Sequence, residues 1–334
     1  MERGNMLERT DRLRGVLWMV AAGLCWSTGG ILVRSVSVTD PWEVVFWRAL
    51  FMTAFMSVFL TAQHRRQVIV QIAAIRFPGV LAGVLLASAS LLFILSVMRT
   101  TVANALVLMS ISPFVAALFG RVFLGEHVPR RTYLAMVVGL TGVTLMFADA
   151  LGSGALSGNL LACGVPVVFA ANVIFLRQMG ATTDTAPTVL LAGLIAFAAA
   201  LPLAWPLTAS WRDVGVLAIM GVFQLGLGCL LFTRATPHLS AAEIGLLSLL
   251  ETTLGPVWVW LGIGERPSNP ALFGAVMVIT SLLANELAGM QQIGLIPFSL
   301  KERRRVQKAQ GTAVESAVHT ALTNGIQTTE KHYQ

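Results

Sequence analysis

The chain has 334 residues, of which 56% are hydrophobic and only 12% are charged, and its mean hydropathy is +0.76. A soluble domain of this size carries about 25% charged residues, so the polar side chains here are too few to cover a water-soluble globule. The net charge of +7 does not indicate a nucleic-acid-binding protein, because the basic residues lie in short gaps between apolar runs. The composition predicts an integral protein of the lipid bilayer with no nucleic-acid partner.

Ten apolar runs follow one another along the chain, each close to the roughly 20 residues that an α-helix needs to cross a bilayer. They cover residues 15–33, 41–62, 78–98, 101–120, 131–148, 158–176, 187–207, 213–233, 240–262 and 269–288. The first run follows a basic segment, as in a signal peptide, but it is too long for the apolar core of one. Segments such as 81–97 are continuously apolar, whereas membrane β-strands alternate polar and apolar residues. We therefore expect an all-α membrane protein with ten transmembrane helices.

The basic residues are distributed unevenly among the gaps between these runs. One of the 23, Arg48, lies within an expected span. If the N-terminus is inside, the outward-facing gaps hold only four others: Arg34, Arg99, Arg212 and Arg266. Because cytoplasmic loops carry an excess of lysine and arginine, this imbalance predicts a multi-pass protein of the inner or plasma membrane with both termini cytoplasmic.

The two halves of the sequence resemble each other. Ala103, Pro113 and Glu126 are followed 139 residues later by Ala242, Thr252 and Glu265. Five spans in each half are an odd number, so the second copy enters the membrane from the opposite side, as in the inverted repeats of secondary transporters. We expect this organisation: a cytoplasmic arm (1–14), a first repeat (15–148), an external linker (149–157), a second repeat (158–288) and a basic cytoplasmic tail (289–334).

Short motifs at several places carry a family resemblance. They are Trp26-Ser27, Phe46-Trp47-Arg48, Ser112-Pro113, Leu124-Gly125-Glu126, Leu250-Glu251 and Gly264-Glu265. With these motifs the chain resembles the EamA-type branch of the drug/metabolite transporter superfamily over about residues 15–288. That family often has Glu-Pro in the middle of the fourth and ninth helices, where this chain has Ser112-Pro113 and Glu251-Thr252. The resemblance implies ten helices, a central cavity and movement of small organic solutes, often outward.

Two charged residues, Arg48 and Glu251, are expected well inside spans, where a charge costs at least about 2.5–3.5 kcal/mol on insertion scales. Their opposite signs in different halves indicate either a site for a zwitterionic or charged solute, or an ion pair that joins two helices. A titrating Glu251 would couple transport to protons, and no other cofactor is expected. We expect Glu43 to be interfacial and Glu243 to be a solvated side chain at a helix start.

Uncharged residues inside the apolar runs are further candidates for solute contact: Ser112, Asn172 and Gln224. In lipid such side chains need a partner, so bonds between helices explain them equally well. Three tryptophans lie away from the interfacial belts, where they would form a flat wall for a solute or simply pack: Trp26, Trp47 and Trp258. Three prolines are expected to interrupt helices and permit gating or plain kinks: Pro113, Pro166 and Pro256.

The leading hypothesis is a secondary transporter that exports a small organic metabolite, amino-acid-like or drug-like, by alternating access. The alternatives are a channel or lipid scramblase and, less favoured, an intramembrane enzyme. The sequence has no Walker A motif, all five histidines lie in gaps or the tail, and neither HExxH nor GxSxG occurs. The three cysteines lack metal-ligand spacing, so we expect no metal and no disulfide. The oligomeric state stays open, with a homodimer among the alternatives.

Overall fold

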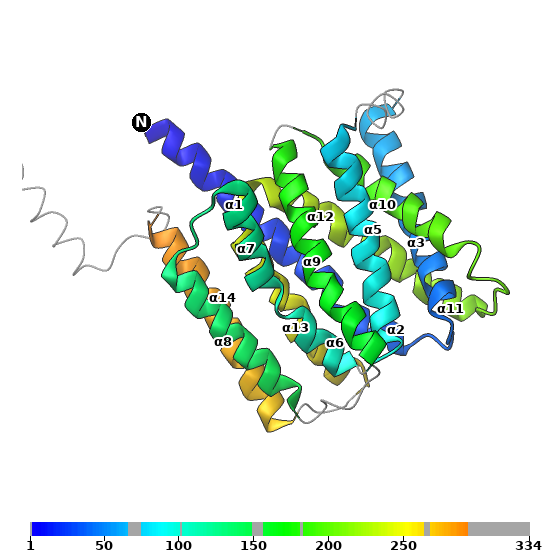
Figure 1. Cartoon of the computed structure of the whole chain (residues 1–334). Coiled ribbons are helices and arrows are strands. Elements are labelled where there is room, and N and C mark those ends of the chain that lie inside the picture. The colour runs from blue at the N-terminus through cyan, green and yellow to red at the C-terminus, as the bar shows by residue number, and fades with distance from the viewer. Residues whose placement is uncertain are drawn as a thin grey trace, which may run out of the picture. The chain divides into compact units, whose positions relative to one another are not determined.

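The computed structural model describes residues 2–65, 75–100, 102–148, 156–180, 183–263 and 268–292, which form helices and the links between them (Figure 1). The first half holds α1 (Glu2–Ser27), α2 (Gly29–Arg34), α3 (Pro41–His64), α5 (Phe77–Val97), α6 (Val102–Met109), α7 (Ser112–Leu124) and α8 (Arg130–Met146). The second holds α9 (Leu156–Met179), α10 (Ala186–Ala200), α11 (Trp211–Ile219), η3 (Met220–Leu227), α12 (Gly228–Ala235), η4 (Thr236–His238), α13 (Ala241–Ile263) and α14 (Asn269–Gln292).

Each of the ten expected spans coincides with one helix or with consecutive helical segments in the described part of the chain. Eight of them are both long and apolar enough to cross a membrane. The other two are shorter, since α8 has 17 residues and α10 has 15. The protein is therefore an all-helical, multi-pass membrane protein, as the sequence predicts.

The helix ends differ from the predicted limits, because hydropathy locates apolar runs while capping and proline decide where helices stop. α1 begins at Glu2, so the expected arm 1–14 is largely helical and continuous with the first span. α10 ends at Ala200, two residues before Pro202, rather than at residue 207. α11 starts after Ser210, which forms a capping box with Asp213. Most of the predicted linker 149–157 lies outside the described residues, and its last two residues belong to α9, which begins at Leu156.

The packing of the helices follows an approximate two-fold relation between the halves. α5 packs on α9, and the corresponding segments η3 and α12 pack on α1. α6 and α7 pack on α9, just as α13 packs on α1. Two helices of the first half pack directly on their own counterparts in the second half: α3 packs on α10, and α7 packs on α13. The structure therefore contains duplicated five-helix halves, and the odd number of helices in each makes the second an inverted copy of the first.

The three prolines affect their helices differently. The fourth predicted span is interrupted between α6 and α7. Pro113 lies in the first turn of α7, where its missing N–H needs no partner. By contrast, α9 continues through Pro166 and α13 continues through Pro256. The predicted helix interruption is thus found at Pro113, whereas it is wrong for Pro166 and Pro256.

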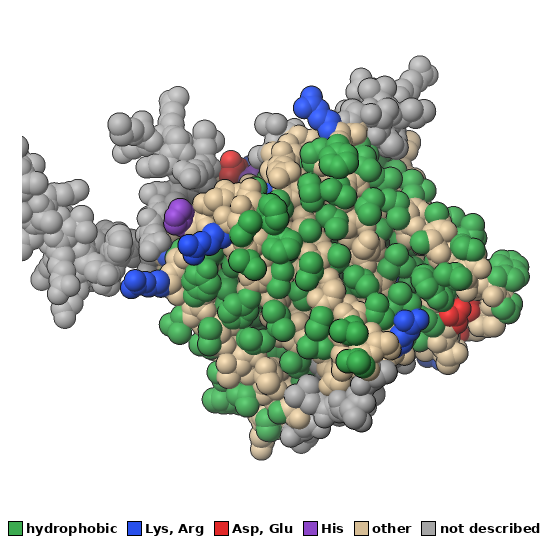
Figure 2. Space-filling model, in the orientation of Figure 1, with side chains coloured by type: hydrophobic (Ala, Val, Ile, Leu, Met, Phe, Trp, Pro, Cys, Tyr) green, Lys and Arg blue, Asp and Glu red, His purple; other side chains and the backbone are tan. Residues whose placement is uncertain are grey.

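The outer surface carries apolar side chains over its middle. Figure 2 shows one face of the molecule covered by hydrophobic side chains, with the charged ones near its margins. Inside, small residues let helices cross closely: a Cβ added to Gly142 on α8 would lie 2.8 Å from the Gly274 carbonyl oxygen on α14. Such close crossings are typical of helix association in lipid, where packing replaces the hydrophobic effect as the driving force.

Candidate functional site

A buried arginine in α3 meets an amide from the second half. Arg48 is only 2% exposed, and its Nη2 donates a hydrogen bond of 3.0 Å to Oε1 of Gln224 in η3. Among the described residues, Nε of Arg48 has no hydrogen-bond partner. A guanidinium presents its donors in a planar fork that suits a carboxylate or phosphate group. The arrangement thus offers an unused donor of a buried cation to an anionic group.

Glu251 of α13 completes this group from the second half. Its side chain interacts electrostatically with Arg48, although no direct ion pair joins them within the described residues. Glu251 also keeps part of its surface accessible, whereas Arg48 and Gln224 are buried. We call Arg48, Gln224 and Glu251 the central polar group. A cation and an accessible carboxylate held apart can bind a solute that carries both charges.

Gln224 owes its position to an unusual backbone segment. Residues 220–227 form a π-helix, a rare conformation that occurs mostly as single turns inside α-helices and is frequent at functional sites. Gly221 lets this segment lie against α3, since an added Cβ there would be 2.6 Å from the Arg48 carbonyl oxygen. On the other side, a Cβ added to Gly29 would lie 2.9 Å from Nε2 of Gln224. Two glycines thus hold the amide between α2 and α3.

The tryptophans predicted for the site occupy three different settings. Trp258 donates a 2.7 Å hydrogen bond from Nε1 to Oγ of Ser27, at the end of α1. Trp26 lies among aromatic rings, with centroids 5.4 Å from Phe232 and 6.4 Å from Phe169. Cys229 is buried beside Trp26 and interacts with Arg48 and Glu251 as well. Trp26 therefore lies next to α12 through Cys229, and Trp258 lies on α13, the helix that carries Glu251.

The third tryptophan, Trp47, is tied to Glu43 one turn earlier in α3. Its Nε1 donates to Oε1 of Glu43 at 3.4 Å. Glu43 also accepts hydrogen bonds from the N–H and hydroxyl of Thr208 and from the N–H of Ala209. Glu43, which we expect at the interface, is 0% exposed, because the link before α11 folds over it and supplies its donors.

Asn172 and Ser112 lie apart from the central polar group. Asn172 of α9 donates from Nδ2 to the Ala82 carbonyl oxygen of α5 at 2.6 Å, and among the described residues its Oδ1 has no hydrogen-bond partner. Ser112 donates to the Met109 carbonyl oxygen three residues earlier, across the break before α7. The structure gives both residues helix-stabilising contacts and shows neither of them beside Arg48.

The Asn172 contact is nevertheless related to that of Gln224 by the duplication. Asn172 follows Gly29 by 143 residues, and Gln224 follows Ala82 by 142 residues. In both places where these helices of the two halves cross, one amide side chain lies against one small residue. The amide is Asn172 of α9 against Ala82 of α5 in one crossing, and Gln224 of η3 against Gly29 of α2 in the other. Only the Gln224 amide meets an arginine, so the duplicated crossings have diverged in chemistry.

Sequence reasoning missed Gly29 and Cys229 as neighbours of the central polar group, and it missed Ser27 as the partner of Trp258. Gly29 shows no special signal, because glycines are frequent in this chain. Ser27 sits in the Trp26-Ser27 motif, which offered a signal. No group of three or more histidine, cysteine or acidic side chains that could hold a metal occurs in the part of the chain that the structure describes.

Comparison with known proteins places these features in a family. The family model of EamA-like transporters matches residues 13–148 and 156–285. The pseudopaline exporter CntI of Pseudomonas aeruginosa is 29% identical over 276 residues, covering 81% of this chain and 95% of that protein. Solute carrier family 35 member G1 of Homo sapiens is 23% identical, covering 80% of this chain and 77% of that protein.

The fold also has a counterpart of known structure. A protein of known crystal structure superposes with a TM-score of 0.72 at 14% identity, covering 83% of this chain and 98% of the other. At this identity the likeness shows the shared fold alone. The two family matches cover both five-helix halves. The chain belongs to the EamA-like transporter family.

Proposed function

We propose that the protein is a secondary exporter of a small organic solute with both a cationic and an anionic group, amino-acid-like or drug-like. Residues 15–148 and 158–288 form its two repeats, which rock against each other to expose the solute site to either side. The observation that carries the proposal is the central polar group, where Arg48 of the first half is hydrogen-bonded to Gln224 and interacts electrostatically with Glu251, both of the second half.

The location of this group supports a transport role. Inverted-repeat transporters bind their solutes near the midplane, at the interface of the repeats. Intramembrane charges are costly and, as a rule, mark solute or ion pathways. Arg48 and Glu251 lie in different halves, so relative movement of the halves changes the distance between them. A bound solute that satisfies both side chains then stabilises one relative position over another.

The outward direction rests on one relative. The first relative reported above carries the name of a pseudopaline exporter. We propose that this protein also exports its solute because it is similar to that exporter. The chemistry of the solute is proposed from Arg48 and Glu251 rather than from the relative's solute.

The experiment that tests the proposal is counterflow in proteoliposomes. Metabolites are first compared in the medium of cells with and without the gene, and those that differ are offered in labelled form. A carrier accelerates uptake of labelled solute when unlabelled solute is trapped inside, whereas a channel does not. Accumulation without such acceleration would favour the channel or scramblase alternative.

The proposed orientation gives the first testable prediction. Asp11 near the start of α1 should face the cytoplasm and Trp211 at the start of α11 should face outward, because the positive-inside rule places the N-terminus inside. In a cysteine-free background, an impermeant maleimide should label Trp211→Cys in intact cells, and Asp11→Cys only after lysis. Labelling of both positions from the same side would contradict the inverted arrangement.

The contact between Gly29 and Gln224 gives the second testable prediction. In Gly29→Ala the new methyl group meets the flexible end of Gln224, so the protein should fold normally but the amide must turn away from Arg48. We expect about a tenfold weaker apparent affinity for the solute, near the low end for a charged hydrogen bond. Gly30→Ala is the matched control, because an added Cβ there meets nothing within 4 Å. Equal affinities for the two variants would exclude Gln224 from the site.

A further inference from the structure

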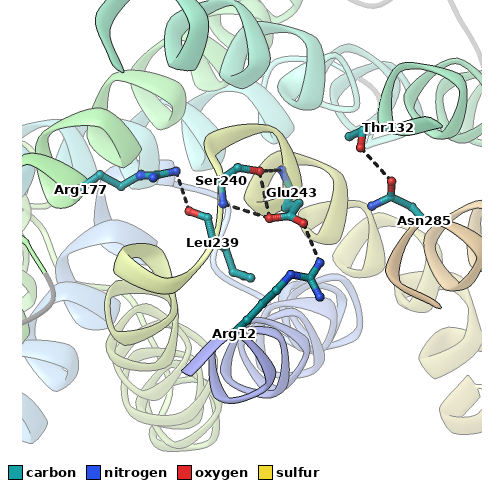
Figure 3. Close-up of polar contacts among 7 residues, drawn as sticks. All are labelled: Arg12, Thr132, Arg177, Leu239, Ser240, Glu243 and Asn285. Atoms are coloured by element: carbon teal, nitrogen blue, oxygen red, sulfur yellow. Dashed lines mark hydrogen bonds and ion pairs between the residues drawn. The ribbon is translucent and has the colours of Figure 1, made fainter. Parts of the chain in front are cut away.

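Two carboxylates converge on the N-terminal end of α13, the helix that carries Glu251. Glu243 accepts hydrogen bonds from the N–H and hydroxyl of Ser240, which precedes the helix (Figure 3). Glu126, from the end of the first half's fourth rod, accepts a 3.0 Å hydrogen bond from the N–H of Ala241. The first N–H groups of a helix have no partners within the helix and favour negative charge. One of these two caps thus comes from a different half of the molecule.

Each carboxylate is also paired with an arginine of the opposite half. Arg12 of α1 donates to Glu243 at 2.7 Å, as Figure 3 shows. Arg177 of α9 forms an ion pair with Glu126 and donates at 2.6 Å to the Leu239 carbonyl oxygen just before α13. Two ion pairs therefore join the halves at one end of α13, and the prediction of a merely solvated Glu243 is wrong.

Two glycines in the sequence bring Glu126 to this place. Gly125 ends α7 with a φ of +67°, in the left-handed region that favours glycine, so the chain reverses and the Glu126 N–H donates to the Gly120 carbonyl oxygen. A Cβ added to Gly120 would lie 2.7 Å from Oε2 of Glu126. The Leu-Gly-Glu motif at 124–126 thus builds a turn that directs a carboxylate onto a helix of the other half.

We infer that Glu126, Arg177, Arg12 and Glu243 form a latch that closes the N-terminal end of α13 and that must open for solute to reach Glu251 from the cytoplasm. The inference rests on the proposed export activity. Glu243 and Glu251 are eight residues apart on α13, about 12 Å along the axis. Because a helix moves as a rigid rod, separation of the halves at Glu243 moves the Glu251 end of the site with it.

The surroundings of the latch suit repeated opening. Its four side chains keep between 11% and 23% of their surface exposed, so water can replace each partner when the halves part. Partly exposed ion pairs open at a lower cost than fully buried pairs, because a fully buried pair would leave unsolvated charges on opening. Arg48, at 2% exposure, lacks such access and belongs to the site rather than to the latch.

The test measures access to α13 directly and does not depend on transport. Leu247 is 2% exposed and lies one turn beyond Glu243 toward Glu251. A Leu247→Cys reporter is made in a background whose native cysteines are changed to alanine, and inside-out vesicles are treated with an impermeant maleimide. We expect Glu126→Ala to raise the labelling rate about fivefold, the effect of losing one partly exposed ion pair.

A second variant on the other ion pair, Arg12→Gln, keeps much of the side chain and should raise labelling likewise. Arg14→Ala is the control, because Arg14 pairs loosely with Asp11 at 3.8 Å on the surface, and it should leave labelling unchanged. Unchanged labelling in either latch variant, with normal folding shown by a single symmetric peak in size-exclusion chromatography, would overturn the latch even where export persists. Failure of the unsubstituted protein in counterflow would instead overturn the proposed function and leave the labelling result standing.

Discussion

Arg48→Ala will lower solute transport about 100-fold, although the protein will insert normally. The substitution removes the buried cation, leaves Oε1 of Gln224 without its donor, and deletes the unused Nε that we assign to an anionic group of the solute. Loss of a hydrogen-bond partner that carries a charge costs about 3 kcal/mol at the upper end, which corresponds to this factor. Initial rates of counterflow over a range of solute concentrations measure the effect.

Arg48→Lys separates charge from geometry in the same assay. Lysine keeps the positive charge but has no planar fork, so part of the affinity should be lost and part retained. Arg234→Ala is the control arginine: it lies over the Phe59 ring at 5.3 Å, near the end of α12, and contacts none of the central polar group. If Arg48→Ala inserted normally and transported with unchanged affinity, Arg48 would be a structural residue.

Glu251→Gln will lower transport at least about tenfold and will remove any dependence on an imposed proton gradient. Glutamine keeps the shape and the acceptor oxygen but cannot carry the charge that a cationic group of the solute, or a proton, requires. The loss of one charged hydrogen bond corresponds to a factor of about ten or more. Counterflow without a gradient and uptake driven by a gradient, measured on the same vesicles, separate binding from proton coupling.

Glu43→Gln is the matched control for Glu251, because Glu43 is another glutamate in a membrane-spanning helix, but one that is fully buried. All its partners are donors of the protein itself: Trp47, Thr208 and Ala209. We expect this variant to lose about 1–3 kcal/mol of stability and to melt at a lower temperature, with solute affinity unchanged. A Glu251→Gln variant with wild-type rates and the same response to a gradient would remove Glu251 from the site.

The three uncharged polar residues predicted for the site show which contacts the sequence does not determine. Gln224, Asn172 and Ser112 look alike in sequence, as single polar residues in apolar runs. In the structure Gln224 meets Arg48, Asn172 bonds to a carbonyl oxygen of α5, and Ser112 bonds within its own rod. Hydropathy and helical spacing fix which residues share a face, but the face that meets another helix depends on the rotation and crossing of both helices.

The sequence by itself determined the membrane class, the ten helical rods, the duplication and the cost of Arg48 and Glu251 inside spans, because these depend on local composition and on spacing along one helix. The tertiary structure alone decided which side chains meet. Arg48 and Gln224 are 176 residues apart, and Glu126 caps a helix that begins 115 residues later. Such contacts arise only when helices of both halves pack together, since no pattern within one helix specifies the partner of its polar side chains.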